Sequence, residues 1–105
     1  MAKRTIFTVT TPLGDRVVVT RDRWREIVRY KHPALADHEN DVRDCLRDPE
    51  LVCASSQDVT VHLYYRPIES RYVCAVVGGD DPAQRFLVTA YFTGKIKQGT
   101  ELWKK

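Results

Sequence analysis

Hydroxyl side chains recur at every second position near the end of the chain. They belong to Thr89, Tyr91 and Thr93, in a segment (85–93) whose intervening residues are mainly apolar. At strand period the hydroxyls share one face and the apolar side chains share the other. Two lysines, Lys95 and Lys97, follow shortly after. The row is either a ligand site or an ordinary β-favouring face, because Thr and Tyr are also common on half-buried strands.

A second polar set alternates along an earlier predicted strand, 59–66. It consists of His62, Tyr64 and Arg66, between apolar or aromatic neighbours. If helices cover the apolar faces of both strands, the two polar sets share the opposite face, about 10 Å apart across one intervening strand. Arginine holds phosphate through a two-pronged hydrogen bond, tyrosine stacks on a base, and lysine adds charge. The predicted face therefore suits a phosphodiester.

Each of these residues also has a purely structural explanation. Tyr64 and Tyr91 fit cross-strand partners that stiffen the sheet. Arg66 fits a solvated strand end, and His62 fits an exposed strand position. His32 fits a helix C-terminus, where cationic side chains are favoured. Both interpretations stay open from these residues alone.

The elements that must position these side chains begin with a β-hairpin. Strands at 5–10 and 16–20 are rich in β-branched residues and flank a loop that contains Pro and Gly. Thr20 or Asp22 then caps a helix, because a short polar side chain satisfies the first free backbone N–H groups.

Two helices are expected next. The first runs to about Lys31 and ends at His32-Pro33, since the residue before proline disfavours helical backbone. The second runs from Ala36 to about Arg47 and ends in the same way at Asp48-Pro49.

Three strands follow as a meander at 59–66, 72–77 and 85–93, and 51–54 can add a short one. Segment 72–77 is apolar on both faces, so we expect it at the centre. Strands joined by short loops pair antiparallel. The predicted fold class is α+β: two N-terminal helices, after a β-hairpin, pack on one face of a curved antiparallel sheet.

Composition sets further bounds. A chain of 105 residues with 43% hydrophobic residues forms a single domain, 1–105, around one core. Its formal charge of +3 permits a polyanionic partner without requiring one. Three widely spaced cysteines match no zinc pattern and favour a reducing cytoplasm. No segment is apolar over the length of a membrane span, and the N-terminus lacks the apolar stretch of a signal peptide.

The chain resembles the PBECR-type domains associated with phages and mobile elements, which belong to the barnase–EndoU–colicin–RelE group of small nuclease folds. The resemblance extends from about Val17 to Trp103. It is carried by Trp24, Ile27, His32-Pro33, Pro49, Leu63-Tyr64-Tyr65-Arg66, the apolar strand 72–77, Val88-Thr89-Ala90-Tyr91-Phe92-Thr93 and Ile96-Lys97-Gln98-Gly99.

This resemblance implies a RelE/barnase-like fold, with a helical N-terminal part on a curved antiparallel sheet of about four strands. It also implies a metal-independent ribonuclease, since many members are toxins that act on RNA. The implied catalytic residues are His32, Arg66, Thr89 and Tyr91. Arg66 would stabilise the phosphate, His32 would transfer a proton, and Tyr91 would act as acid or stacking platform. Thr89 would donate a hydrogen bond to phosphate.

The substrate-binding residues expected beside them are Tyr64, Thr93, Lys95 and Lys97. The predicted function is an endoribonuclease, toxin-like, that cleaves RNA by 2′-hydroxyl attack on the adjacent phosphate. The alternative is a non-catalytic nucleic-acid- or protein-binding module that uses the same open face. A DNA nuclease ranks last, because it would usually need a metal. We expect no cofactor, metal or membrane contact. The expected partner is RNA, and an antitoxin or another protein is a further candidate.

Overall fold

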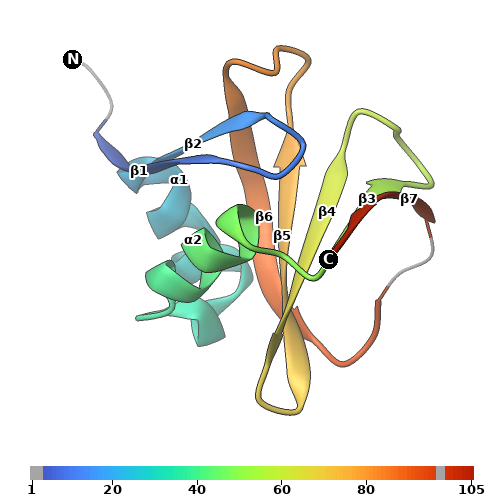
Figure 1. Ribbon diagram of the computed structural model, residues 1–105. Coiled ribbons are helices and arrows are strands. Elements are labelled where there is room, and N and C mark those ends of the chain that lie inside the picture. The colour runs from blue at the N-terminus through green and yellow to red at the C-terminus, as the bar shows by residue number, and fades with distance from the viewer. Residues whose placement is uncertain (1–3, 97–98) are drawn as a thin grey trace.

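Seven strands form one sheet in the computed structural model, which describes residues 4–96 and 99–105 (Figure 1). The sheet has the order β1-β2-β6-β5-β4-β3-β7. The strands are β1 (Thr5–Thr10), β2 (Arg16–Thr20), β3 (Leu51–Ser55), β4 (His62–Ile68), β5 (Arg71–Gly78), β6 (Arg85–Thr93) and β7 (Gly99–Lys104). The predicted α+β class and the central position of β5 are confirmed.

The helical segments lie together against one side of the sheet (Figure 1). They are α1 (Arg21–Glu26), the π-helical turn η1 (Ile27–Lys31), the 3-10 turn η2 (Pro33–Leu35) and α2 (Glu39–Arg47). The Thr20 hydroxyl accepts a hydrogen bond from the Arg23 backbone N–H at 3.2 Å, which confirms the predicted cap. The second helix begins three residues later than predicted, because Asp37 has φ +68° and cannot be part of a helix.

Two pairings in the sheet were not predicted. The hairpin β1–β2 joins the meander through a short parallel contact, in which Val17 pairs with Arg85 and Val18 pairs with Phe86. Strand β7 adds an antiparallel edge next to β3. A side chain at Gly99, the first residue of β7, would collide with the Ala54 carbonyl oxygen, so only glycine allows this approach.

The register separates the two faces of the sheet. Ala90, Ala75 and Tyr64 are neighbours across β6, β5 and β4, and all three belong to the main core under the helices. Tyr91, Cys74 and Tyr65 form the adjacent row on the opposite face, which carries a second, smaller core. The prediction that Tyr64 and its alternating neighbours lie on the open face is therefore wrong.

The predicted alternation along β6 is correct only in its second half. A bulge shifts the register, so that Val76 pairs with Thr89 but Val77 pairs with Leu87. Leu87 consequently lies in the main core, while Phe86 is 45% exposed. In the described residues, no helix is long and apolar enough to cross a membrane.

Candidate functional site

His32 leaves the helical segment at a widened turn. Its backbone N–H donates to the Ile27 carbonyl at 2.7 Å, a bond over five residues instead of four. Pro33 has no N–H to continue the helix, and it starts the 3-10 turn η2. Because η2 packs against β6, the imidazole lies at this strand. Single π-helical turns of this kind often occur at functional sites.

Tyr91 meets His32 from β6. The ring centroids are 5.5 Å apart, with planes tilted by 37°. Burial is the main cause that raises the pKa of the Tyr91 phenol, and the neighbouring Cys74 raises it further. The phenol therefore stays protonated at neutral pH. The structure thus brings together two of the four catalytic residues that the resemblance implies.

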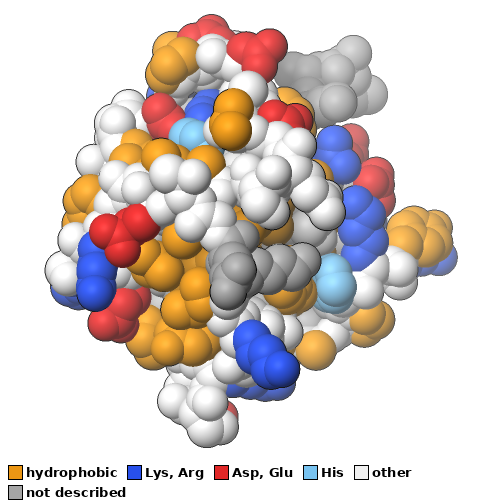
Figure 2. All heavy atoms as spheres, turned by 90° about the vertical axis from the view of Figure 1, so that its right-hand side faces the viewer, with side chains coloured by type: hydrophobic (Ala, Val, Ile, Leu, Met, Phe, Trp, Pro, Cys, Tyr) orange, Lys and Arg blue, Asp and Glu red, His pale blue; other side chains and the backbone are white. Residues whose placement is uncertain are grey.

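These two rings share a surface hollow, which we call the basic hollow. It is lined by Lys31, His32, Pro33, Ala34, Leu35, Arg71, Tyr91 and Phe92. The lining includes two cations, one imidazole, one phenol and no carboxylate. The Arg71 guanidinium carbon lies 4.1 Å from the centre of the Phe92 ring, a distance typical of a cation–π contact. Figure 2 shows the side of the sheet away from the helices, with a histidine and basic side chains together near one edge.

Tyr91 also lines a second hollow, on the face of the sheet away from the helices, which we call the polar hollow. Its lining consists of Ser55, Ser56, Gln57, Asp58, Val61, Leu63, Val76, Thr89 and Tyr91. The Thr89 hydroxyl oxygen is buried and has no hydrogen-bond partner among the described residues. A buried hydroxyl without a partner is costly, so a ligand that bonds to it would bind favourably.

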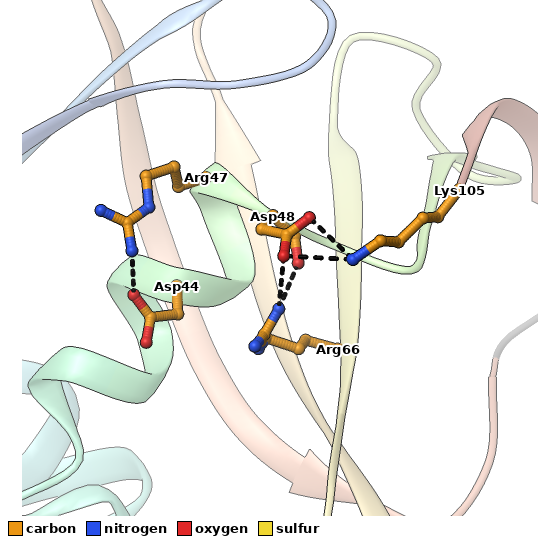
Figure 3. Close-up of polar contacts among 5 residues, drawn as sticks. All are labelled: Asp44, Arg47, Asp48, Arg66 and Lys105. Atoms are coloured by element: carbon orange, nitrogen blue, oxygen red, sulfur yellow. Dashed lines mark hydrogen bonds and ion pairs between the residues drawn. The ribbon is translucent and has the colours of Figure 1, made fainter.

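Arg66 lies on the helix side of the sheet, opposite the face of Tyr91. Arg66 is two residues after buried Tyr64 on β4, so its side chain points to the same face of the sheet, toward α2. Its Nη1 donates to the backbone carbonyl of Asp48 at 2.6 Å and to the Asp48 carboxylate at 3.1 Å (Figure 3).

The C-terminal residue completes this contact. Lys105 Nζ binds the same Asp48 carboxylate at 3.1 Å (Figure 3). Hydrogen bonds from Lys105 and then from Arg66 hold the pKa of the Asp48 carboxyl below its usual range. The Arg66 guanidinium therefore binds Asp48, the residue that follows α2. The structure does not bring it to His32 and Tyr91.

His62 and Tyr64 are also placed away from the basic hollow. His62 Nδ1 lies 3.1 Å from Arg85 Nη1, which donates in turn to Asp15 Oδ2 at 3.1 Å. We call these three residues the buried charge cluster. The same guanidinium donates to the Thr60 carbonyl. Burial and then the Arg85 charge lower the pKa of His62. Burial raises the pKa of Tyr64 to about 12.

Thr93 is the last residue of the hydroxyl row and of β6, and Lys95 follows it in the chain. The Thr93 hydroxyl donates to the Lys95 carbonyl at 3.0 Å and accepts from the Lys95 N–H at 3.2 Å, so it stabilises the turn. The Lys95 side chain is exposed. Lys97 lies outside the described residues.

Sequence reasoning missed the two cations of the basic hollow. In the sequence, Lys31 is an ordinary residue of a helix end, and Arg71 follows a two-residue turn, where a charged residue is common. No local signal distinguishes Arg71 from a solvated turn residue. Only the register, which pairs the neighbouring Tyr72 with Thr93 at the end of β6, shows the position of Arg71.

The geometry offers a site for an anion with an adjacent aromatic ring. Among the described residues, no group of three or more His, Cys, Asp or Glu side chains is placed to hold a metal ion. We compared the chain with protein-family models, curated proteins and solved structures, and none of them matches.

Proposed function

We propose that the chain binds RNA at the basic hollow and cleaves it as a metal-independent endoribonuclease. The observation that supports this proposal is the approach of the His32 and Tyr91 rings, 5.5 Å apart, in a hollow with two cations and no carboxylate. A phosphate is attracted by Lys31 and Arg71, and a ring beside it can stack on a base.

In the proposed reaction the 2′-hydroxyl oxygen of RNA attacks the adjacent phosphorus. His32 takes the proton of that hydroxyl, and Lys31 and Arg71 stabilise the charge that develops on the phosphate oxygens. The bond from phosphorus to the 5′-oxygen breaks, and the leaving oxygen takes up a proton from solvent water. The products are a 2′,3′-cyclic phosphate and a free 5′-hydroxyl. Tyr91 contributes a stacking surface and a protonated hydroxyl.

We further propose that the chain has a RelE/barnase-like fold and acts in the cytoplasm. The curved, largely antiparallel sheet with helical segments on one side supports a RelE/barnase-like fold, although the parallel β2–β6 contact and β7 exceed the four strands expected. Three buried free cysteines, Cys45, Cys53 and Cys74, support a reducing cytoplasm. Toxin-like action, a link to phages and an antitoxin partner remain expectations from the resemblance.

A binding module without catalysis is the second candidate. One observation favours it: burial raises the pKa of the Tyr91 phenol, which makes this side chain a poorer proton donor to the leaving oxygen. Such a module would hold RNA through the same cations and rings, without cleaving it.

Incubation of the purified protein with mixed RNA in excess EDTA tests the proposal. We expect cleavage that persists in EDTA and leaves 2′,3′-cyclic phosphate ends. Cleavage that EDTA abolishes would refute the metal-independent mechanism. RNA binding without cleavage would favour the binding module.

A further inference from the structure

We propose that the outer edge of β7 binds β7 of a second copy of this chain, so that two sheets join into one antiparallel sheet about a two-fold axis. In this pairing, Glu101 of each copy lies opposite Lys104 of the other. The pairing is independent of the proposed function. Three observations carry it: the position of β7, the register of its bulge, and the charges that this register places on one face.

Strand β7 is one of the two outer strands of the sheet, and β3 is its inner neighbour (Figure 1). Among the described residues, no strand pairs with the outer side of β7. Every residue of β7 except Trp103 is exposed, and the apolar Leu102 is 39% exposed. Backbone N–H and C=O groups along such an edge are a template for another strand. The strand contains no proline, which would interrupt a new ladder.

The bulge in β7 decides which of its side chains share a face. Leu51 pairs with Lys104, and Cys53 pairs with Glu101. Because Leu51 and Cys53 are two residues apart on β3, they and their partners on β7 lie on one face. Glu101 and Lys104 are three residues apart, a spacing that puts side chains on opposite faces of a regular strand. The extra residue of the bulge therefore brings these opposite charges to the same face.

A two-fold axis through the bulge, perpendicular to the sheet, pairs β7 with its own copy. Directly opposite residues in an antiparallel pair lie on the same face and interact. Glu101 and Lys104 meet this condition, and both copies contain the same extra residue, so the register agrees on each side of the axis. Leu102 then lies opposite Trp103 of the other copy. The dimer gains two ion pairs, and its isologous interface closes with two copies.

The charges favour β7 over the other outer strand as the site of pairing. Strand β1 has no charged residue between Thr5 and Thr10, so no charge pair fixes a register there. The basic hollow stays open in the dimer, because none of its lining residues belongs to β3 or β7. Two strands of six residues make a small interface, so we expect a reversible dimer.

Analytical ultracentrifugation of the full chain, from micromolar to millimolar concentration, tests the pairing. We expect a monomer–dimer equilibrium. Glu101→Lys places lysines opposite each other on both sides of the axis, so the dissociation constant of its dimer should rise about tenfold or more. Lys104→Glu should weaken the dimer in the same way. An equimolar mixture of the two variants should dimerise again, because each lysine then faces a glutamate.

Glu69→Lys is the matched control. It makes the same change in net charge at an exposed residue in the turn between β4 and β5, so its dimer should be nearly as stable as that of the wild type. Amide hydrogen exchange locates the contact. The N–H groups of β7 should gain protection as the concentration rises, and those of β1 should not. A wild-type melting temperature shows that each variant is folded.

Four results would overturn the inference: a monomer throughout this concentration range, a dimer that Glu101→Lys does not weaken, a mixture of the two variants that stays monomeric, or new protection at β1 in place of β7. These results would leave RNA cleavage intact, since that reaction needs the basic hollow only. Conversely, a dimer that cuts no RNA would refute the proposed enzyme and retain the pairing of β7.

Discussion

Two regions of this molecule combine a histidine with an arginine, and they differ in what these side chains face. In the buried charge cluster, Arg85 contacts both His62 and Asp15, and 7% of its side chain is exposed. In the basic hollow, Arg71 lies over an aromatic ring at the surface, beside His32. The first region uses its charges to join strands and loops. The second holds its charges at the surface, where we propose that a ligand binds. The partners of these side chains therefore separate the two roles better than the residue types do.

Removal of Arg85 should have the largest effect on stability. Arg85→Met leaves Asp15 and His62 buried without their shared donor, and breaking a buried ion pair in this way costs about 3–5 kcal/mol in the free energy of unfolding. Urea denaturation measures the difference. Arg47→Ala is the control, because Arg47 is 63% exposed and forms a surface pair, so its loss should change stability by about 0.5 kcal/mol or less. Equal stabilities of the two variants would contradict the structural role of the cluster.

Arg71 and Arg66 should separate binding from structure. Arg71→Ala should weaken RNA binding about tenfold or more, because hydrogen bonds to a charged partner contribute about 1.5–3 kcal/mol. Arg66→Ala should leave RNA affinity unchanged, because its guanidinium already binds Asp48 and does not line the basic hollow. Filter binding at fixed salt compares them. If Arg66→Ala abolishes binding and Arg71→Ala does not, the phosphate site belongs to Arg66, as the resemblance implies.

A smaller effect is expected from pH. His62 accepts from Arg85 in its neutral form, and its pKa in the folded state lies below the ordinary value of 6.5. Between these two pKa values the unfolded chain binds more protons, so the free energy of unfolding should fall as the pH drops below about 6.5. Comparison with His62→Gln isolates this contribution from other titrating groups. A wild-type stability that does not decrease relative to His62→Gln on acidification would argue against the contact.

The sequence predicted the elements of this fold better than their faces. Pro33 and Pro49, the cap at Thr20 and the apolar strand 72–77 are local signals, and each marks an element that the structure contains. The parity of β4 could not be read, because Leu63, Tyr64 and Tyr65 are consecutive and all buried. Alternation identifies a face only where one side of a strand is solvated.

Two other features depend on distant parts of the chain. Strand β7 is mostly exposed, and its position depends on the close approach of Gly99 to β3. The bulge in β6 exchanges the faces of Leu87 and Phe86, without a glycine or proline at that point to signal it. For the site, His32 and Tyr91 were predicted together and lie together, whereas Arg71 could be found only from the pairing of β5 with β6.

The most direct test of the account is the single-turnover rate of RNA cleavage in His32→Gln and His62→Gln, with the RNA dissociation constant of each. If His32 transfers the proton, His32→Gln should cleave about 10²–10⁴-fold more slowly, with nearly unchanged RNA affinity. His62→Gln should cleave at the wild-type rate under conditions where it is folded. A wild-type rate in His32→Gln, or a greater loss in folded His62→Gln, would contradict the assignment of the site to the basic hollow.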